Sequence, residues 1–306
     1  MKKYPLVSIY TCVYNGEKTL HRVFESMKQL DYPNIEHIIV NVGSTDKTEE
    51  LVQGYINQVP FTVKYHKKEN GGKHTALNAA WSLAEGEFLV NLDADDKLLP
   101  HSVRFLVETY YQIPEEIRQE YWCVHGRCET QYGKFVGDKY PDDINCGHWS
   151  ENGKRAKKCK GDKLGLQVRK YLCQYKFPEV KGVTHVAESI LWNQINKVYG
   201  TWYTNEVVLI YYDDHIGDNL SAKKTKRKQF GTLAHRLKWE IMHEQEYGKS
   251  IKTLLCYPLC YYIADKNFQK HNGYLADIKK HRILLTMLRP VMFAGAFIYR
   301  TVKGVR

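Results

Sequence analysis

Three carboxylates stand within four positions of the chain. Asp93, Asp95 and Asp96 directly follow residues 88–92, a short apolar run with the length and composition of a buried strand. Clustered carboxylates repel one another, and this repulsion costs free energy unless a cation or hydrogen-bond donors offset it. Mg²⁺ and Mn²⁺ are usually held by one or two carboxylates and complete their coordination with substrate phosphates. The cluster therefore predicts a metal-dependent enzyme that acts on a phosphate-bearing substrate.

A structural explanation of the same aspartates is also open. Aspartate is common in turns after strands and at helix starts, because its side chain accepts hydrogen bonds from free backbone N–H groups. Asp96 could in this way cap a helix that begins near Pro100. The two explanations differ in what should surround the cluster: a functional site requires other polar turns at the same edge of the sheet, whereas a helix cap does not.

The first hundred residues alternate between apolar runs and amphipathic segments, which predicts a parallel, Rossmann-like α/β sheet. The expected strands are residues 6–12, 35–42, 61–66 and 88–92, and the expected helices are residues 19–29, a segment ending near residue 58, and residues 73–84. In such sheets, ligands bind beyond the carboxyl ends of the strands. Three polar turns occupy those ends, at residues 14–16, 43–46 and 93–96. Their convergence favours a functional site.

The rest of the chain divides into an irregular middle and a helical end. Residues 121–162 are rich in Gly, Tyr and charge and are expected to form strands and active-site loops. A helix over residues 188–198 and a strand over residues 202–212 are expected next. The predicted domains are residues 1–221, which contain the sheet, and a helical C-terminal extension, residues 222–306.

Charge is distributed unevenly along the chain. Of its 306 residues, 43% are hydrophobic and 26% are charged, which is ordinary for a globular protein. Residues 223–306 contain 18 Lys and Arg against 5 Asp and Glu, whereas residues 1–222 contain 27 basic and 29 acidic side chains. The net positive charge is therefore confined to the extension. It suggests an anionic partner, either a membrane surface or nucleic acid, and the membrane is the preferred hypothesis.

Three segments, in this order, resemble family 2 glycosyltransferases of the GT-A fold. They are Ser-Ile-Tyr-Thr-Cys-Val-Tyr-Asn-Gly (8–16), Val-Gly-Ser-Thr-Asp-Lys-Thr (42–48) and Asp-Ala-Asp-Asp (93–96). Residues 70–78, 160–163 and 188–192 resemble a bacterial subgroup that builds surface polysaccharides. The resemblance covers about residues 5–221. It implies a mostly parallel sheet flanked by helices, and an inverting, metal-dependent transfer of a sugar from a nucleotide-diphosphate sugar.

The resemblance also implies roles for individual residues. Asp95 would hold Mn²⁺ or Mg²⁺ at the diphosphate, and Asp93 would face the ribose or the same metal. Glu188 would be the base that removes the proton from the acceptor hydroxyl. Asp162 and Trp192 would contact the acceptor. The remaining residues expected to bind the donor are Thr11, Val13, Asn15, Glu17, Asn41, Lys73, Asn78 and Ala94.

Two positions depart from the family pattern. The acidic residue that usually precedes Gly-Ser-Thr-Asp and contacts the nucleotide base is replaced here by Asn41 and Val42. This replacement weakens the expectation of a UDP-linked donor. An arginine that the family often carries is replaced by Leu77, so Lys73 or His74 would supply the positive charge that faces the phosphates.

Two rival functions stay open at this stage. A sugar nucleotidyltransferase shares the sheet and the metal carboxylates, but it normally has a Gly-rich loop with a basic residue after the first strand. Here residues 14–17 are Tyr-Asn-Gly-Glu. A nucleic-acid-binding protein would explain the basic extension but not the carboxylate cluster.

The expected acceptor is a glycan or a lipid-linked sugar at the cytoplasmic face of the plasma membrane. The first residues lead directly into a strand without a secretory signal, so a cytoplasmic location is expected. Peripheral attachment to the inner face of the membrane, through the extension, is the accompanying hypothesis. Residues 283–299 are apolar with basic neighbours and could lie in a membrane interface or pack on the catalytic domain.

Overall fold

The computed structural model describes residues 4–141, 146–147, 158–177, 179, 186, 188–214, 237, 255–257, 259–260 and 282–303. The chain divides into two compact units, residues 1–184 with 188–219, and residues 185–187 with 220–306. All of the site residues expected from the sequence lie in the first unit. The predicted domain boundary near residue 221 stays a prediction.

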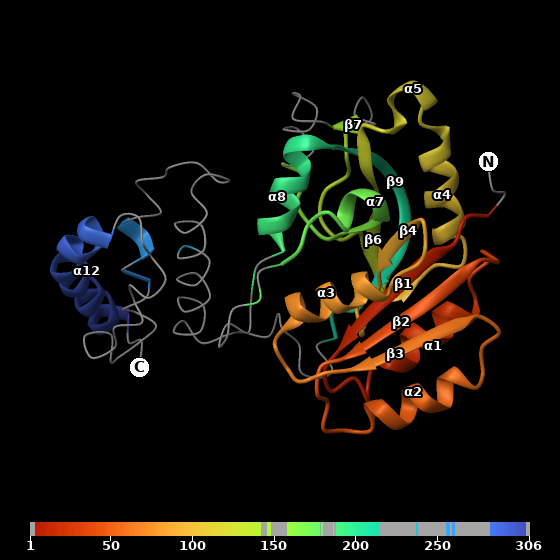
Figure 1. The fold of residues 1–306 in the computed structure, drawn as a ribbon, viewed down its shortest axis with the longest axis horizontal. Coiled ribbons are helices and arrows are strands. Elements are labelled where there is room, and N and C mark those ends of the chain that lie inside the picture. Colours follow the sequence, from red (N-terminus) through yellow and green to blue (C-terminus); the bar gives the residue numbers. More distant parts are fainter. Residues whose placement is uncertain are drawn as a thin grey trace. The chain divides into compact units, whose positions relative to one another are not determined.

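Within the described residues, the first unit is built on a nine-stranded sheet (Figure 1). Its strands are β1 (Val7–Val13), β2 (Ile35–Asn41), β3 (Thr62–Lys67), β4 (Phe88–Asn91), β5 (Lys97–Leu98), β6 (Tyr121–Thr130), β7 (Cys146–Gly147), β8 (Lys163–Val168) and β9 (Gly200–Tyr211). Their order is β3-β2-β1-β4-β8-β6-β9-β5, and β7 pairs with β9. β1 to β4 are parallel to one another, and β8 is antiparallel to both β4 and β6.

The burial of each strand follows from its place in the sheet. β2 is buried along its whole length and β1 nearly so, because helices cover both faces of these central parallel strands. β3 lies at the edge and is largely exposed. It carries Lys64 and Lys67. Charged side chains of this kind protect an edge strand from pairing with other chains.

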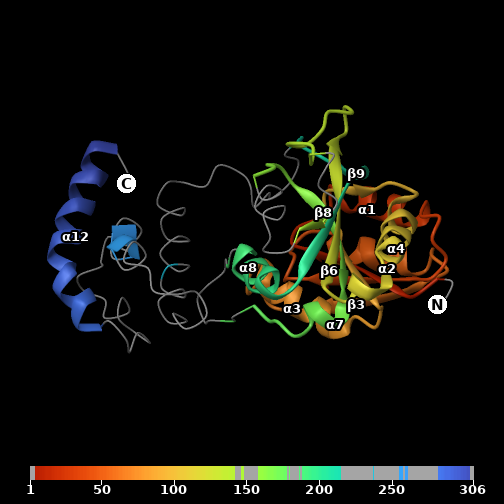
Figure 2. The ribbon, with the colours of Figure 1, turned by 90° about the horizontal axis from the view of Figure 1, so that it is seen from above.

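The helices form two layers around the sheet. They are α1 (Leu20–Lys28), α2 (Thr48–Ile56), α3 (Lys73–Leu83), α4 (Ser102–Gln112), α5 (Glu115–Arg118), α7 (Arg169–Leu172) and α8 (Ser189–Val198). Figure 2 shows α1, α2 and α4 on one side of the strands, and α3 and α8 on the other. On this second side, α3 contacts β1 and β2, and α8 contacts β9.

The predicted α/β sheet with flanking helices is confirmed. The limits expected for β1 to β4 differ from the observed limits by no more than one residue at either end. A helix was expected to begin near Pro100, and α4 begins at Ser102. No expectation covered β8, and the sequence did not indicate that β8 inserts between β4 and β6. Residues 222–270 of the predicted helical extension fall almost wholly outside the described residues.

The described part of the second unit consists mainly of α12 (Arg282–Lys303). Leu285 and Ala296 are buried within this unit, whereas Met287 is 72% exposed and Val291 is 66% exposed. Among the helices that the structure describes, none combines the length and hydropathy needed to cross a membrane.

Candidate active site

The turns after β1 and β2 are joined by direct hydrogen bonds. The Asn15 side-chain carbonyl accepts from the backbone N–H of Thr45 (2.9 Å), and the Asn15 N–H donates to the Ser44 hydroxyl (2.9 Å). Asn15 has a φ of +52°, a left-handed conformation that asparagine tolerates better than most residues. The Glu17 N–H donates to the Asp46 carboxylate at 2.9 Å. Two motifs separated by about 30 residues thus form one rigid rim.

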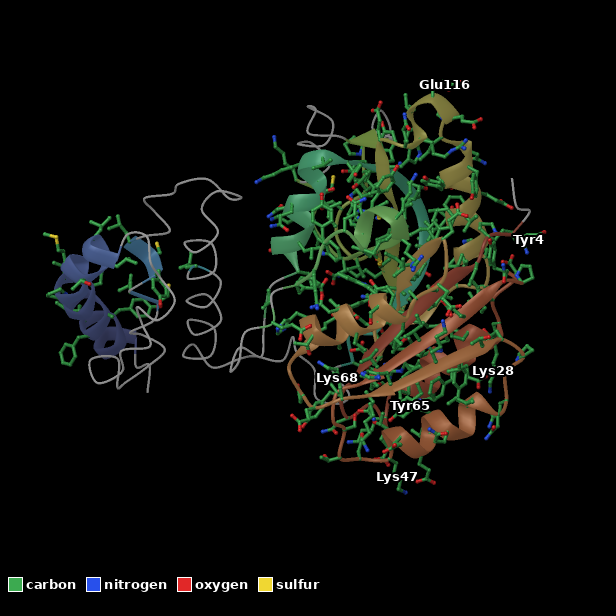
Figure 3. The ribbon with its side chains drawn as sticks, in the orientation of Figure 1. Tyr4, Lys28, Lys47, Tyr65, Lys68 and Glu116 are labelled. Carbon is green, nitrogen blue, oxygen red and sulfur yellow. The ribbon has the colours of Figure 1, made fainter. Side chains whose placement is uncertain are left out.

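Asn41 is fully buried at the end of β2. Its side-chain oxygen accepts from the Ser44 N–H (2.9 Å), and its side-chain nitrogen donates to the Tyr65 hydroxyl (2.9 Å). Tyr65 is labelled on β3 in Figure 3. Asn41 therefore fixes the turn after β2, and its role toward the nucleotide base stays a prediction.

Thr11 and Val13 have side chains buried in the body of the sheet. The Thr11 hydroxyl lies 3.1 Å from His37 Nε2, and His37 Nδ1 lies 3.1 Å from the Tyr55 hydroxyl of α2. Burial lowers the pKa of His37 to about 3, so this imidazole is neutral at physiological pH. The side chain of Thr11 thus faces α2, and any donor contact by Thr11 or Val13 would use the backbone.

Lys73 joins two of the expected site residues. Its ammonium lies 2.9 Å from Asp93 Oδ1 and 3.1 Å from Glu188 Oε1. Asp93 follows β4, Lys73 is the first residue of α3, and Glu188 immediately precedes α8. The structure therefore brings together the expected metal-end carboxylate, phosphate-facing lysine and catalytic base. We call these two ion pairs the Lys73 bridge.

Lys73 and Asp93 each stabilise the charged form of the other. Burial opposes the charge of Lys73, but Asp93 and Glu188 outweigh it and raise the lysine pKa well above its ordinary value. Burial alone would raise the pKa of Asp93, but Lys73 and a hydrogen bond from Asn91 lower it. The side chains of Lys73, Asp93 and Glu188 are 25%, 41% and 37% exposed, so a ligand can reach all three.

The environment of Asp95 and Asp96 disfavours their negatively charged forms. Burial raises the pKa of Asp95, and the neighbouring charge of Asp93 raises it further. Burial, followed by the charges of Asp93 and Asp95, raises the pKa of Asp96 to about 8. Ala94 lies between them and is partly exposed. Excess negative charge beside an accessible carboxylate fits a divalent cation.

Asp96 does not cap a helix, which corrects the structural explanation considered above. α4 begins at Ser102, behind His101, and the Asp96 carboxylate instead accepts from the Tyr212 N–H at 3.1 Å. Asp96 is only 4% exposed. It therefore fastens the residues after β9 to the carboxylate cluster, which leaves Asp93 and Asp95 as the accessible members.

No group of three or more His, Cys, Asp and Glu side chains in the described parts of the chain is arranged to hold a metal by itself. A cation held by one or two carboxylates and by substrate phosphates needs fewer protein ligands. Asp93 and Asp95 fit such a partial site.

Arg22 supports the cluster from α1, a role that the sequence did not indicate. Its guanidinium donates to the Asp95 carbonyl (3.3 Å), pairs with the Asp214 carboxylate (2.5 Å) and lies 3.9 Å from the centre of the Tyr212 ring. In the sequence, Arg22 has the appearance of a polar residue on an amphipathic helix. No local signal marks it, because its partners are more than 70 residues away.

Cys12 is a second residue that is absent from the individual site residues expected above. Its thiol is near the Lys73 bridge. Burial raises its pKa to about 12, against an opposing effect of Lys73, and the charges of Asp93 and Glu188 add to the rise. Cys12 is partly exposed and lies at the end of β1. At physiological pH the Cys12 thiol would be uncharged, so it would give the site a neutral lining at this position.

Asp162 lies at the margin of the carboxylate cluster. Its charge adds to the raised pKa of Asp96, after the larger effects of burial, Asp93 and Asp95. The preceding Gly161 has a φ of +89° and crosses Gly137, so a Cβ on Gly161 would lie 2.5 Å from the Gly137 Cα. The crossing explains why glycine precedes Asp162 and fixes its position.

Asn78 and Trp192 hold the two helices that carry the Lys73 bridge. The Asn78 amide donates to the Phe177 carbonyl and accepts from the Phe177 N–H, both at 2.9 Å. Trp192 stacks on Trp122 with ring centres 5.5 Å apart and lies 6.2 Å from Trp81. These contacts orient α3 and α8. The expected contacts of Asn78 with the donor and of Trp192 with the acceptor stay predictions.

Residues 8–120 match the family model described as glycosyl transferase family 2. We call residues 8–120 the family 2 segment, because this part of the chain is similar to glycosyltransferases of that family. The resemblance drawn from the motifs is confirmed there. The family 2 segment contains the turns after β1 and β2, Lys73 and the carboxylate cluster, and it ends before Asp162 and Glu188.

Two curated relatives show how far the sequence similarity extends. An uncharacterized glycosyltransferase of Rickettsia bellii is 33% identical over 145 residues, which make up 46% of this chain and 20% of the relative. Hyaluronan synthase of Pasteurella multocida is 36% identical over 110 residues, which make up 36% of this chain and 11% of the synthase. The matches thus span a fifth or less of these two relatives.

Solved structures extend the similarity of the fold beyond the family 2 segment. S. aureus TarS 1–349 in complex with UDP-GlcNAc superposes with a TM-score of 0.59 at 17% identity, covering 97% of this chain and 90% of TarS 1–349. The mannosyltransferase PcManGT from Pyrobaculum calidifontis, in complex with GDP-Man and Mn²⁺, gives a TM-score of 0.54 at 18% identity, covering 97% and 87%. The predicted GT-A fold is confirmed.

Proposed function

We propose that this chain is an inverting, metal-dependent glycosyltransferase that uses a nucleotide-diphosphate sugar as donor. The observation that carries the proposal is the Lys73 bridge, which joins a candidate metal carboxylate, Asp93, to a candidate base, Glu188. Both lie near the carboxyl ends of parallel strands, where ligands bind in sheets of this type. The match of residues 8–120 to family 2 glycosyltransferases supports the same reaction class.

Asp95 and Asp93 are the residues proposed to hold Mn²⁺ or Mg²⁺. When bound, such an ion would supply positive charge to the departing nucleoside diphosphate. The support from this chain is the weakly offset negative charge at Asp95 and the accessibility of Asp93. PcManGT, which shares the fold, was crystallised with Mn²⁺.

Glu188 is proposed to accept the proton of the acceptor hydroxyl as that oxygen attacks the anomeric carbon. It lies directly before α8, and its side chain is 37% exposed, so an acceptor hydroxyl can approach it. A single base and an attack opposite the leaving diphosphate would invert the configuration at the anomeric carbon. Asp162 and Trp192 are proposed to lie on the acceptor side.

UDP is the first donor nucleotide to test. TarS, which shares the fold, was crystallised with UDP and with UDP-GlcNAc, whereas PcManGT was crystallised with GDP-Man. The rim formed by Asn15, Glu17 and the turn after β2 is the proposed place of the nucleoside. The rim offers no carboxylate to the base at position 41, because an asparagine stands there. The amide of Asn41 is in addition already hydrogen-bonded to Ser44 and Tyr65.

The acceptor is proposed to be a glycan or lipid-linked sugar of a cell-surface polysaccharide, met at the inner face of the plasma membrane. α12 contains four basic residues and no acidic residue, and several of its apolar side chains are exposed, among them Leu284, Met287, Val291 and Ile298. A basic helix with an exposed apolar face fits a membrane interface. We therefore propose that the extension attaches the protein peripherally to anionic membranes.

Flotation with lipid vesicles tests this attachment. The protein should float with vesicles that contain phosphatidylglycerol, and the double variant Met287→Glu, Val291→Glu should stay in the soluble fraction because buried carboxylates oppose insertion. Vesicles of phosphatidylcholine alone are the control for the charge requirement. Flotation of the double variant with anionic vesicles would show that α12 does not make the contact.

The reaction itself is tested by release of nucleoside diphosphate from a panel of UDP- and GDP-sugars. Release should require Mn²⁺ or Mg²⁺, stop in EDTA, and be abolished by Asp95→Ala without a change in the circular dichroism spectrum. Glu85→Gln, at the opposite end of the sheet, should release diphosphate as the wild type does. Activity that persists in Asp95→Ala would contradict the metal assignment.

A further inference from the structure

The Lys73 bridge combines a fixed backbone with a movable head group. Lys73 follows Gly72, which has a φ of +92°, and the Gly72 N–H donates to the Asn70 side-chain oxygen at 3.1 Å. A Cβ on Gly71 would lie 2.9 Å from the Thr75 hydroxyl, so the turn before α3 is tightly packed. The lysine ammonium is carried on a flexible four-carbon stem, so it can change partners while this backbone stays in place.

We infer that Lys73 is a positioning residue whose ammonium competes with the divalent metal for Asp93. Before the donor binds, the ammonium neutralises Asp93 and anchors Glu188; when metal and donor enter, the ammonium leaves Asp93 for the diphosphate. This inference rests on the proposed function, because it assumes the metal assignment to Asp93 and Asp95.

The competition follows from the geometry at one oxygen atom. Asp93 Oδ1 is the atom that Lys73 contacts, at 2.9 Å. An ammonium and a divalent cation held by the same carboxylate would stand within a few ångströms of each other, where like charges repel strongly even in the polarisable environment of a protein. Among the ion pairs that the structure describes, Asp95 makes none, so Asp93 is the proposed metal carboxylate that a cation would have to share with Lys73.

The exchange has a consequence for the catalytic base. Glu188 shares the ammonium with Asp93, so the loss of the Asp93 contact leaves Lys73 with one carboxylate partner in place of two. The incoming diphosphate offers stronger negative charge than Glu188 alone. Glu188 Oε1 is then free to accept the proton of the acceptor hydroxyl. The base is thus engaged in the donor-free protein and becomes available once the donor is loaded.

Mn²⁺ binding without nucleotide tests the competition directly. Electron paramagnetic resonance measures the loss of the free Mn²⁺ signal as protein is added. Lys73→Gln should bind Mn²⁺ about tenfold more tightly than the wild type, because a competing unit charge has been removed. Lys73→Met should do the same, and Lys73→Arg, which keeps the charge, should bind as weakly as the wild type.

Lys64→Gln is the matched control, because Lys64 also bridges two carboxylates, Glu36 and Glu85. Its Mn²⁺ affinity should equal that of the wild type. A structural defect caused by Lys73→Gln would weaken Mn²⁺ binding, so an increase in affinity cannot come from misfolding.

Two results would overturn the inference, and they are distinguishable. Equal Mn²⁺ affinity in the wild type, Lys73→Gln and Lys73→Met, with tight binding of Mn²⁺ in the presence of UDP, would leave the proposed function in place and remove the competition. Absence of Mn²⁺ binding in every variant, with and without UDP, would reject the metal site and the competition together.

Discussion

Two lysines in this chain each bridge two carboxylates, and they do so at opposite ends of the parallel strands. Lys64 lies 2.8 Å from Glu36 and 2.8 Å from Glu85. Lys73 lies 2.9 Å from Asp93 and 3.1 Å from Glu188. The two lysine side chains are almost equally exposed, at 24% and 25%. The two bridges therefore contain the same kinds of charged group, at similar distances and with similar exposure of the lysine.

The carboxylates of the two bridges differ in how completely the protein satisfies them. Glu36 is 3% exposed, and it also accepts from the Ser8 hydroxyl (2.5 Å) and the Glu85 N–H (2.7 Å). Asp93 and Glu188 are 41% and 37% exposed. The buried and multiply bonded Glu36 holds Lys64 in one arrangement even though Glu85 is 73% exposed. Neither carboxylate of the Lys73 bridge is buried, so that network can exchange partners. The Lys64 bridge is therefore assigned to stability and the Lys73 bridge to ligand binding.

The largest expected difference between the bridges is in turnover. Glu188→Gln should lower the rate of sugar transfer by about 10²- to 10⁴-fold, since a general base contributes an effect of that size. Donor binding should change little. Glu85→Gln, the corresponding exposed partner of Lys64, should leave turnover unchanged. Equal turnover in Glu188→Gln and the wild type would remove Glu188 as the base.

The second difference is in stability. Lys64→Ala leaves Glu36 buried without its cation and should lower the free energy of unfolding by about 2 kcal/mol, less than for a fully buried pair because Lys64 is partly exposed. Lys73→Ala leaves two carboxylates that water can reach, and it should cost less than about 1 kcal/mol. Urea denaturation at pH 7 measures both. A larger loss in Lys73→Ala would reverse the assignment.

A smaller effect is expected in the pH dependence of stability. Burial would raise the pKa of Glu36, but Lys64, Ser8 and the Glu85 N–H lower it below its ordinary value of 4.5. The unfolded chain then binds a proton at a higher pH than the folded chain, so stability from Glu36 is present above pH 4.5 and is lost as the pH falls through the lowered pKa.

Urea denaturation between pH 6 and pH 3 measures this loss. The acid-dependent fall in stability should be shallower in Glu36→Gln than in the wild type, because the variant has no carboxyl to protonate at this position. Parallel pH profiles for the two proteins would show that Glu36 does not contribute to acid destabilisation.

The sequence was sufficient to predict the turns of the site. Each apolar run ends where a polar turn begins, and parallel strands bring their carboxyl ends to one edge of the sheet. The sequence therefore predicts that the residues after β1, β2 and β4 lie close together. The family resemblance added the roles of Asp95 and Glu188, which spacing alone does not define.

The sequence was not sufficient to predict contacts across long separations. Lys73 and Glu188 are 115 residues apart, and their meeting depends on how Trp81, Trp122 and Trp192 pack α3 against α8. Arg22 carries no motif that points to Asp214. Local pattern encodes strands and turns, whereas these contacts depend on the order β4-β8-β6-β9, which no local pattern contains.

A thermal-shift titration with UDP-GlcNAc and Mn²⁺ tests most directly whether the Lys73 bridge belongs to a nucleotide-sugar site. A ligand that binds only the folded state raises the unfolding temperature. A rise is expected only when nucleotide sugar and metal are both present; it should vanish in Asp95→Ala and persist in Lys64→Gln, measured against that variant's own unfolding temperature. If no UDP- or GDP-sugar raises the unfolding temperature, or if the rise survives in Asp95→Ala, the central claim is contradicted.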